Sequence, residues 1–501
     1  MIADKLMHRI ALGLFAAAGC FAAPSAFALA TITIVNTDGP GEGFNDPAVP
    51  NANAGCNVGE TLGQCRLRVF NVAAAQWGQL LNSNVTIIVN AAMNPLTCSG
   101  TSAVLGSAGP QDAFADFPNA PKPTTAYVSA LANSLAGADQ DPASHDINAQ
   151  FNVDIDNGTC LNGTVGWYYG TDPTAPRPND RTPLLPVVFH ELGHGLGFVS
   201  LYSNTTGAPL TGTDVPIWGY YLYDNETSKY WRNMTTAERQ ISKINDPDLV
   251  WTGTRTNKQS PKFLGPPAKV IVNSPAGIAG NYDAQTAEFG ANVATNPVTN
   301  GVVLVDDGVV GAPNPTAGTI NDGCETPFVN AAAVAGKIAL IDRGYCTFVI
   351  KVKNAQLAGA VGVIIANNVA AGLPGMGGAD QTITIPSLGT TQAAGTAIKA
   401  NLPAPGVNAT LGVLIGAPLA GTQAGCVRLN APNPVVTGSS VSHFTADTFP
   451  NLLMEPSLNT TIFDKVDLTL PLFQDIGWIT GVENILFIDG FDPNPCPFVQ
   501  P

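Results

Sequence analysis

The sequence predicts an α+β protein in which a β-rich segment is set into a domain of mixed helices and strands. Three observations predict this arrangement. The chain has 501 residues, more than a single domain usually holds. Over residues 31–265, short β-branched runs alternate with helical patterns, and a further helical pattern ends near Trp478. Between them, residues 266–418 are rich in Val, Gly, Ala and Asn, in short runs punctuated by Gly and Pro.

The charge balance excludes several classes of function. The chain has 22 Lys and Arg against 37 Asp and Glu, a formal net charge of −15. Proteins that bind nucleic acid or anionic membrane surfaces need basic patches, so neither partner is expected. With 45% hydrophobic and 12% charged residues, the chain is also unlike a disordered protein.

The first thirty residues are expected to be a signal peptide. A basic start, Lys5 to Arg9, precedes an uncharged apolar run over 10–23. The tripeptides AFA at 26–28 and ALA at 28–30 each offer a small-x-small cleavage site. The apolar run is too short to cross a bilayer, and no later run reaches about 18 apolar residues. We therefore expect a secreted protein without a membrane span.

Cysteine usage agrees with export. Apart from Cys20 in the signal segment, eight cysteines remain, and an even number in an exported chain predicts four disulfides. No CxxC pair is present, so a cysteine zinc site is not expected. The pairing expected is between neighbours in the sequence: Cys56–Cys65, Cys98–Cys160, Cys324–Cys346 and Cys426–Cys496.

The elements of the first segment follow in order. β-branched runs bounded by Asn and Gly predict strands over 31–36 and 84–94. Apolar residues at helical spacing predict a helix over 126–138. Alternating apolar and polar residues predict a half-buried strand over 146–156. Residues 170–183, rich in Pro, Asp and Thr, predict a loop.

The motif HELGH at 190–194 carries the chemistry. On a helix expected near 184–197, His190 and His194 are one turn apart, so both imidazoles can bind one metal ion. Glu191 lies beside them and can take a proton as general base. A buried stripe on the opposite face is formed by Leu185, Phe189, Leu192 and Leu196. Gly197 can then end the helix.

A catalytic zinc needs a third protein ligand, and the remaining histidines of the mature chain are His145 and His443. The metzincin pattern HExxHxxGxxH would place the ligand at position 200, where Ser200 stands. The stretch GSSVSHFTADTFPNLLMEP resembles the third-ligand and Met-turn region of leishmanolysin-type metzincins, which have extra sequence before the third histidine. The resemblance implies that His443 is the third ligand and that Met454 underlies the metal. LPLFQDIGW (470–478) is similar to the helix that closes the catalytic domain in related metzincins.

Two other ligand sets are possible from the sequence. His145 lies on an expected strand, where a structural role is the simpler interpretation. A gluzincin arrangement would recruit a downstream glutamate, either Glu226 or Glu238, but it leaves the region around His443 and Met454 without a role.

The stretch GKIALIDRGYCTFVIKVKNAQLAGAVGVIIANN, within 322–368, closely resembles the protease-associated (PA) domain. The resemblance implies a Cys324–Cys346 disulfide and a domain with no catalytic machinery, inserted in exported peptidases to influence substrate access or partner binding. Residues 337–341 and 362–367 fit buried strands, and 348–360 fits the helix between them. PA domains also occur in subtilisin-like and dinuclear-zinc peptidases. No GTSMA-like segment is present for the first class, and the histidines are too few for the second.

The expected architecture is a metzincin-like zinc peptidase domain interrupted by a β-rich PA domain. The tail VENILFIDGFD (482–492) is similar to short C-terminal tails of exported bacterial proteins, which favours a bacterial origin. The expected divisions are a signal peptide at 1–30, the two parts of the peptidase domain at 31–265 and 419–480, the PA domain at 266–418 and a tail at 481–501. The first part begins with a segment that a propeptide would occupy.

The expected function is that of a secreted zinc metalloendopeptidase that hydrolyses peptide bonds in proteins with a zinc-activated water. Its partners would be protein or peptide substrates, and Tyr202 and Tyr220 are candidates for assisting groups. The acidic balance permits Ca²⁺, but no DxDxDG loop supports it. The alternative is a catalytically inactive binding or adhesion protein on the same scaffold, against which the intact Glu191 argues. Specificity and oligomeric state are not encoded in these patterns.

Overall fold

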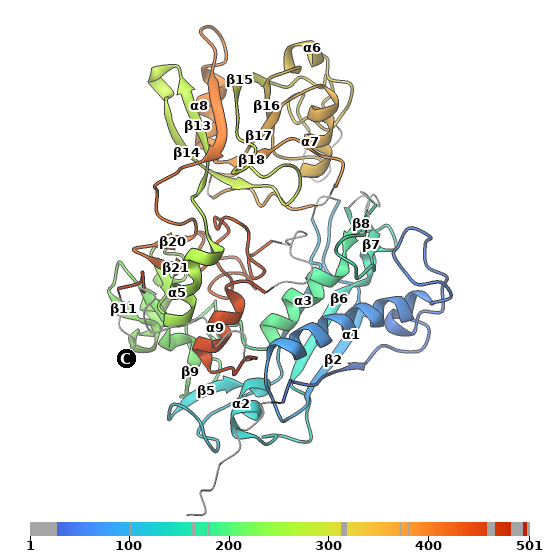
Figure 1. The fold of residues 1–501 in the computed structure, drawn as a ribbon, viewed down its shortest axis with the longest axis vertical. Coiled ribbons are helices and arrows are strands. Elements are labelled where there is room, and N and C mark those ends of the chain that lie inside the picture. Colours follow the sequence, from blue (N-terminus) through green and yellow to red (C-terminus); the bar gives the residue numbers. More distant parts are fainter. Residues whose placement is uncertain are drawn as a thin grey trace, which may run out of the picture.

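The computed structural model describes residues 28–100, 102–161, 166–175, 177–178, 181–311, 318–370, 372–378, 380–457, 466–481 and 494–497. The expected signal segment up to residue 27 and the tail motif at 482–492 lie outside these residues. In Figure 1 a lower body holds the helices α1, α3, α5 and α9, and a β-rich body in yellow and orange lies above it.

A four-stranded sheet forms the first half of the lower body. Its order is β1-β2-β6-β3, with β1 (Ile32–Asn36), β2 (Ile87–Asn94) and β6 (Ile147–Asn152) parallel. The edge strand β3 (Gly106–Pro110) runs antiparallel to β6. Ile87, Val89, Ala91 and Met93 are buried at alternate positions of β2, as its β-branched pattern predicts.

Helix α1 (Leu62–Leu80) packs across this sheet and against helix α3 (Leu184–Gly195). It begins at Thr61, whose side chain forms a capping box with Gln64. Near its end, the Trp77 ring stacks on Phe189, with ring centroids 4.6 Å apart. Trp77 Nε1 also donates to the Phe189 carbonyl at 2.9 Å, so α1 fixes the helix that carries HELGH.

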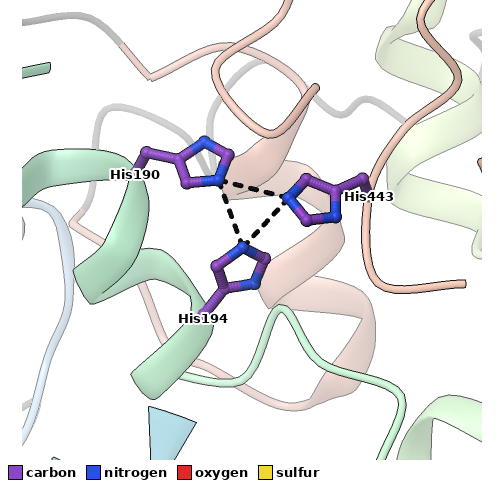
Figure 2. A group of neighbouring side chains, drawn as sticks. All are labelled: His190, His194 and His443. Atoms are coloured by element: carbon purple, nitrogen blue, oxygen red, sulfur yellow. Dashed lines mark hydrogen bonds between the residues drawn. The ribbon is translucent and has the colours of Figure 1, made fainter. Parts of the chain in front are cut away.

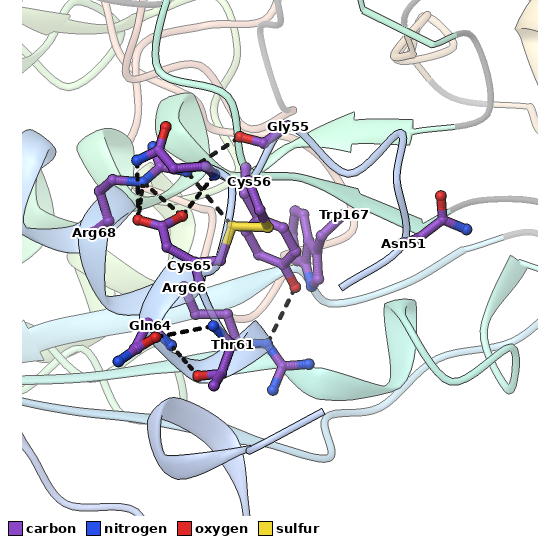
Figure 3. The surroundings of a disulfide bond; sticks show 12 residues. Asn51, Gly55, Cys56, Thr61, Gln64, Cys65, Arg66, Arg68 and Trp167 are labelled. Carbon is purple, nitrogen blue, oxygen red and sulfur yellow. Dashed lines mark hydrogen bonds and ion pairs between the residues drawn. A yellow bond between two sulfur atoms is a disulfide. The ribbon is translucent and has the colours of Figure 1, made fainter. Parts of the chain in front are cut away.

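The Cys56–Cys65 disulfide ties the loop before α1 to the first turn of that helix (Figure 3). Beside it, the guanidinium of Arg68 donates to the Gly55 carbonyl at 3.1 Å and pairs with Glu60 at 3.0 Å. The loop is therefore held to the helix by both a covalent bond and charge-assisted hydrogen bonds.

Several of the expected elements differ in their limits. The strand expected over 84–94 begins at Ile87, and the loop expected over 170–183 ends in the short strand Arg181–Pro183. The helix expected over 126–138 begins only at Ser129, as α2 (Ser129–Ala136), because the preceding apolar residues form strand β5 (Thr125–Val128). The strand expected over 146–156 ends at Asn152 and is followed by the 3-10 turn Val153–Ile155. The small strands around them are β4 (Ala113–Phe114), β7 (Gly166–Tyr168), β8 (Arg181–Pro183) and β9 (Val215–Pro216).

A second sheet joins residues from both sides of the β-rich body. Strand β12 (Leu249–Trp251) pairs with β21 (Cys426–Arg428), although more than 170 residues separate them. The outer strands are β11 (Lys229–Tyr230) and β10 (Leu222–Asp224) on one side and β20 (Thr422–Gln423) on the other. The helices of this half are α4 (Thr236–Ser242), α5 (Thr254–Phe263) and α9 (Thr469–Ile476).

The upper body is a closed barrel. In order around the barrel its strands are β13 (Ala268–Ser274), β14 (Gly280–Thr286), β18 (Ser387–Thr390), β17 (Gly362–Ala366), β16 (Ile338–Asp342), β15 (Val298–Leu304) and β19 (Asn408–Val413). Helices α6 (Ala331–Val334), α7 (Phe348–Leu357) and α8 (Gln392–Ala400) accompany them. Alternate residues of β16 and β17 face two separate hydrophobic cores, which explains why both runs are apolar throughout.

The two ends of the barrel segment meet at one place. The Ala420 amide donates to the Gly265 carbonyl at 2.8 Å, so the chain enters and leaves side by side. The Gly265 amide in turn donates to the Phe449 carbonyl at 2.6 Å, and the Phe449 ring is buried in the barrel core. An insertion with adjacent ends adds little strain to its host domain.

The structure has the four disulfides expected from neighbour pairing, including Cys98–Cys160, Cys324–Cys346 and Cys426–Cys496. At the start of the described chain, the Ala30 amide donates to the Leu81 carbonyl at 2.8 Å, so the last residues of the expected signal segment pair with the fold. Among the described residues, no helix is both long and apolar enough to cross a membrane.

Close packing of α3 on β6 gives a first prediction. A Cβ at Gly195 would lie 2.4 Å from Cγ2 of Ile147. We expect Gly195→Ala to lower the free energy of unfolding by about 1–3 kcal/mol, because the buried strand cannot move away. Denaturant unfolding measures this. Gly109→Ala is the control, in strand β3 of the sheet that contains Ile147, since nothing lies within 4 Å of a Cβ added there. Equal stability of the two variants would contradict the described packing.

Candidate metal centre

The helix α3 carries two of the histidines because its two faces differ. It begins after Pro183, and Leu185, Phe189 and Leu192 are fully buried on the core side. His190 and His194 leave the opposite face, one helical turn apart. The fold thus fixes the spacing of both imidazoles before any metal is considered.

The turn after α3 positions His194. Gly197 has a φ of +125°, which a residue with a side chain rarely adopts, and the Phe198 amide folds back to the Gly193 carbonyl at 3.0 Å. This return brings the Phe198 carbonyl to Nδ1 of His194 at 2.7 Å.

The third histidine arrives from the other side of the barrel insertion. His443 lies in the loop after β21, and its Nδ1 faces the Ser439 carbonyl at 2.9 Å. Nδ1 of His190 faces the Leu453 carbonyl at 2.7 Å. The contiguous metzincin pattern would place a histidine at Ser200. The Ser200 amide instead donates to Oγ of Ser442, the residue before His443, at 3.2 Å.

These contacts fix the tautomer of all three rings. A carbonyl oxygen only accepts, so each Nδ1 carries the hydrogen and each Nε2 presents a lone pair. The Nε2 atoms of His190 and His194, and of His194 and His443, are 3.1 Å apart, and those of His443 and His190 are 3.2 Å apart (Figure 2). Burial lowers the pKa of His190 to about 4 and that of His194 to about 3, and lowers the pKa of His443 well below its usual value. Three neutral donors therefore point at one place.

This donor set fits a tetrahedral zinc ion. Zinc bound by imidazoles at about 2.0–2.1 Å requires nitrogen atoms about 3.3 Å apart, close to the separations of this triad. Without a cation, three converging lone pairs repel one another, and none of the three nitrogens has a hydrogen to share. Three protein ligands leave a fourth position open, as in catalytic zinc sites.

Glu191 lies beside the triad with one carboxylate oxygen engaged. Its Oε2 accepts a hydrogen bond from the Ala108 amide of edge strand β3 at 2.9 Å. Burial raises the pKa of Glu191 to about 7. A carboxyl group that titrates near neutral pH can both accept and return a proton.

Met454 lies under the helix that carries the ligands. It is fully buried, and a Cβ at Gly193 would lie 2.9 Å from its Sδ. The Met454 carbonyl accepts from the Phe444 amide at 2.9 Å, which joins the loop of Met454 to the residue after His443. Because Gly193 of HELGH has no side chain, Met454 can pack closely against this helix.

The structure separates the other candidates from the triad. His145 precedes β6 rather than lying on it, and it contacts Asn90 and Asn148 at 3.0 and 2.7 Å. Glu226 is exposed in a turn, and Glu238 caps α4 through Thr235.

The two candidate tyrosines also have other surroundings. The Tyr202 ring lies against Trp231, with centroids 5.3 Å apart, and Tyr220 OH accepts from Thr125 Oγ1 at 3.0 Å. Neither tyrosine has a described hydrogen bond to the three histidines.

Among the described residues, two further groups of metal-ligating side chains lie close together, but the side chains of both groups have other partners. Cys56 and Cys65 are joined as a disulfide beside Glu60. Asp307, Asp322 and Glu325 surround the buried ammonium of Lys351, which donates to the Asp322 carbonyl at 2.6 Å. Calcium remains without support at this acidic cluster.

Sequence reasoning missed the backbone groups of the site. The Ala108 amide and the carbonyls of Phe198, Ser439 and Leu453 orient Glu191 and the three rings. Every residue has these groups, so no side-chain pattern marks them. Only the two glycines of HELGHG, Gly193 and Gly195, indicated in the sequence that other residues pack closely against this helix.

Comparisons with known proteins match parts of the chain. The PA domain family model matches residues 309–398, so the chain contains a PA domain, as the sequence predicted. The SPBPB7E8-like family model matches residues 52–213, which include α3. The mixed α/β architecture with a β-rich PA domain is thus confirmed.

Curated relatives share short segments. Vacuolar-sorting receptor 2 of Arabidopsis thaliana is 29% identical over 160 residues, 30% of this chain and 25% of the receptor. The probable lipoprotein aminopeptidase LpqL of Mycobacterium tuberculosis is 32% identical over 136 residues, 24% of this chain and 27% of that protein. The chain thus spans about a quarter of the length of these relatives.

A similar solved structure is BSAP, a zinc aminopeptidase from Bacillus subtilis, at 24% identity with a TM-score of 0.21. The match covers 32% of this chain and 36% of that one. A TM-score this low assigns no shared fold.

The buried imidazoles predict a pH dependence of the metal-free chain. Because their pKa values are lowered on folding, the unfolded chain binds more protons below pH 6.5, and stability falls as the pH falls from about 6.5 toward about 3. Glu191 has the opposite effect, because its pKa is raised on folding: it increases the stability of the folded chain as the pH falls from about 7 to 4.5. We expect His194→Gln to flatten the acid side of the stability profile, measured by thermal unfolding after chelation. His145→Gln, outside the triad, should keep the parental profile, and a parental profile in both variants would contradict the prediction.

Proposed function

We propose that this chain is an exported zinc metalloendopeptidase of the metzincin type, with His190, His194 and His443 as the zinc ligands. The observation that carries the proposal is the convergence of three neutral imidazole Nε2 atoms, 3.1–3.2 Å apart. Glu191, the residue after His190, adds a carboxylate to the same helix. The four disulfides support an oxidising compartment, in line with a signal peptide over 1–30.

The surroundings of His443 favour the leishmanolysin-like arrangement. A long segment containing the barrel separates His443 from His194, and Met454 lies beneath α3 against Gly193. Both features are what the resemblance of the residues around His443 to the Met-turn region implies. Glu226 and Glu238 lie elsewhere, which weakens the gluzincin alternative.

A zinc ion held by three imidazoles supplies Lewis acidity that activates water and polarises a substrate carbonyl. Glu191 is the general base in this proposal. Its Oε2 is held by the Ala108 amide, which leaves Oε1 to take the proton of the attacking water and pass it to the leaving amine. Its pKa of about 7 matches that double role.

The edge strand β3 supports an extended substrate. It is the terminal strand of its sheet, and the Ala108 amide already points from it to Glu191. An open strand edge offers further backbone groups to an extended peptide, which is the recognition expected of an endopeptidase.

The PA domain is proposed to influence substrate access or partner binding. It contacts the host domain at two segments that flank the metal centre. Oε1 of Gln381 accepts from the Arg177 amide in the loop before α3 at 3.3 Å, and Thr286 Oγ1 donates to Asn451 Oδ1 before Met454 at 3.1 Å. A partner bound to the PA domain would therefore act on the segments of chain that lead to α3 and to Met454.

Replacement of the general base tests the proposal. We expect Glu191→Gln to lower casein hydrolysis by about 10²–10⁴-fold, because the proton acceptor is lost while the three ligands remain. Zinc content, measured by elemental analysis, should stay that of the parent. Glu226→Gln is the matched control and should retain full activity.

The other outcomes discriminate the alternatives. Zinc binding without cleavage of casein by the parent would favour the inactive binding protein. Cleavage of an aminoacyl nitroanilide but not of casein would replace the endopeptidase by an aminopeptidase, the activity named for the mycobacterial relative. Equal cleavage by the parent and Glu191→Gln would place the chemistry elsewhere.

A further inference from the structure

His190 is oriented by a backbone carbonyl, so the position of that peptide decides where the ring points. Nδ1 of His190 faces the Leu453 carbonyl at 2.7 Å. The amide of the same residue, Leu453, donates to Oδ2 of Asp467 at 2.5 Å. A carboxylate 14 residues further along the chain therefore holds the residue on which the histidine rests.

Asp467 is itself fixed at the start of helix α9. Its Oδ1 accepts from the Thr469 amide at 3.0 Å and from Thr469 Oγ1 at 2.9 Å. Asp467 is 9% exposed and Thr469 is fully buried. Both carboxylate oxygens thus act as acceptors.

We infer that Asp467 is a positioning residue of the metal centre, which sets the orientation of the His190 ring through the Leu453 backbone. The inference rests on the proposed zinc site. It extends that site beyond its ligands to α9, a helix that supplies none of them.

An asparagine at position 467 cannot replace the aspartate, because it cannot accept hydrogen bonds at both ends of its side chain. Asparagine has one acceptor oxygen and one NH₂ donor. At position 467 the NH₂ group would face either the Leu453 amide or the Thr469 donors, so one set of hydrogen bonds is lost. Groups that orient a metal-bound histidine typically contribute a factor of about 10–100 in metal affinity.

A matched control lies within α9 itself. Asp475 is an aspartate of that helix, and both of its oxygens act as acceptors. They bind the Arg255 amide at 2.9 Å and the Thr256 amide and Trp251 Nε1 at 3.1 Å each. These contacts hold α5 and strand β12 to α9, and none of them involves the loop of Leu453. Asp475→Asn therefore reports the cost of the same change without the link to His190.

The experiment compares Asp467→Asn and Asp475→Asn in the full chain. Zinc affinity is measured by competition with a chelator, and the visible spectrum of the Co²⁺-substituted protein reports the ligand geometry. We expect Asp467→Asn to bind zinc about 10–100-fold more weakly than the parent and to shift the Co²⁺ bands. Asp475→Asn should keep both the parental affinity and the parental spectrum, even where its melting temperature falls.

A second pair of variants covers a failure of Asp467→Asn to fold. Thr469→Val removes one donor to Asp467, and Thr256→Val removes the equivalent donor to Asp475, whose Oδ2 it contacts at 2.6 Å. Both threonines are fully buried. We expect the Co²⁺ spectrum to change in Thr469→Val and not in Thr256→Val.

The outcomes separate this inference from the proposed function. A parent that binds no zinc overturns the zinc site and the inference with it. A parent that binds zinc, with equal affinity and spectrum in the two members of each pair, overturns the role of Asp467 alone.

Discussion

Three lone pairs that point at one place repel one another, and much of the lower body is arranged to hold them there. Each ring is turned by a carbonyl oxygen from a different segment, those of Phe198, Ser439 and Leu453. Burial keeps the rings neutral, so no proton takes the place of a cation. The repulsion is balanced by packing: α1 fixes α3 through Trp77, and Met454 supports it from below at Gly193. A set of donors held in this way is preorganised for a metal, and little rearrangement is needed on binding.

The carboxylates of Glu191, Glu455 and Asp467 differ in the hydrogen bonds that they accept. Glu191 has one oxygen engaged by a single amide and a pKa raised to about 7 by burial, so it can exchange a proton. Glu455 and Asp467 are also buried, but each receives hydrogen bonds from the loop that contains Met454, at Leu452 and Leu453 respectively. The loop is therefore anchored on both sides of Leu453. The carboxylate of Glu191 is bound by one backbone amide, whereas those of Glu455 and Asp467 each accept several hydrogen bonds and anchor the loop of Met454.

The sequence carried the local features of this fold and fewer of the long-range ones. The spacing of His190 and His194 and the buried stripe of Leu185, Phe189 and Leu192 are properties of a single helix. The PA domain was predicted from one long stretch around Cys324 and Cys346. The start of α2 was wrong by three residues, because the apolar run before Ser129 fits a strand as well as a helix. The pairing of β12 with β21 and the contact between Ala108 and Glu191 depend on backbone groups brought together by the whole chain. Such contacts cannot be predicted from the pattern of side chains along the sequence.

The adjacency of Gly265 and Ala420 has a consequence for biosynthesis. His443 follows His194 by 249 residues, and every strand of the barrel lies between them in the chain. A polypeptide emerging from a ribosome or a translocation pore therefore exposes HELGH long before the partner that completes the triad. During that interval the nascent chain has only two of the three imidazoles of the triad and cannot assemble the site. Truncated products that stop within the barrel lack His443 for the same reason, so the order of synthesis itself delays the three-histidine site until its chain is nearly finished.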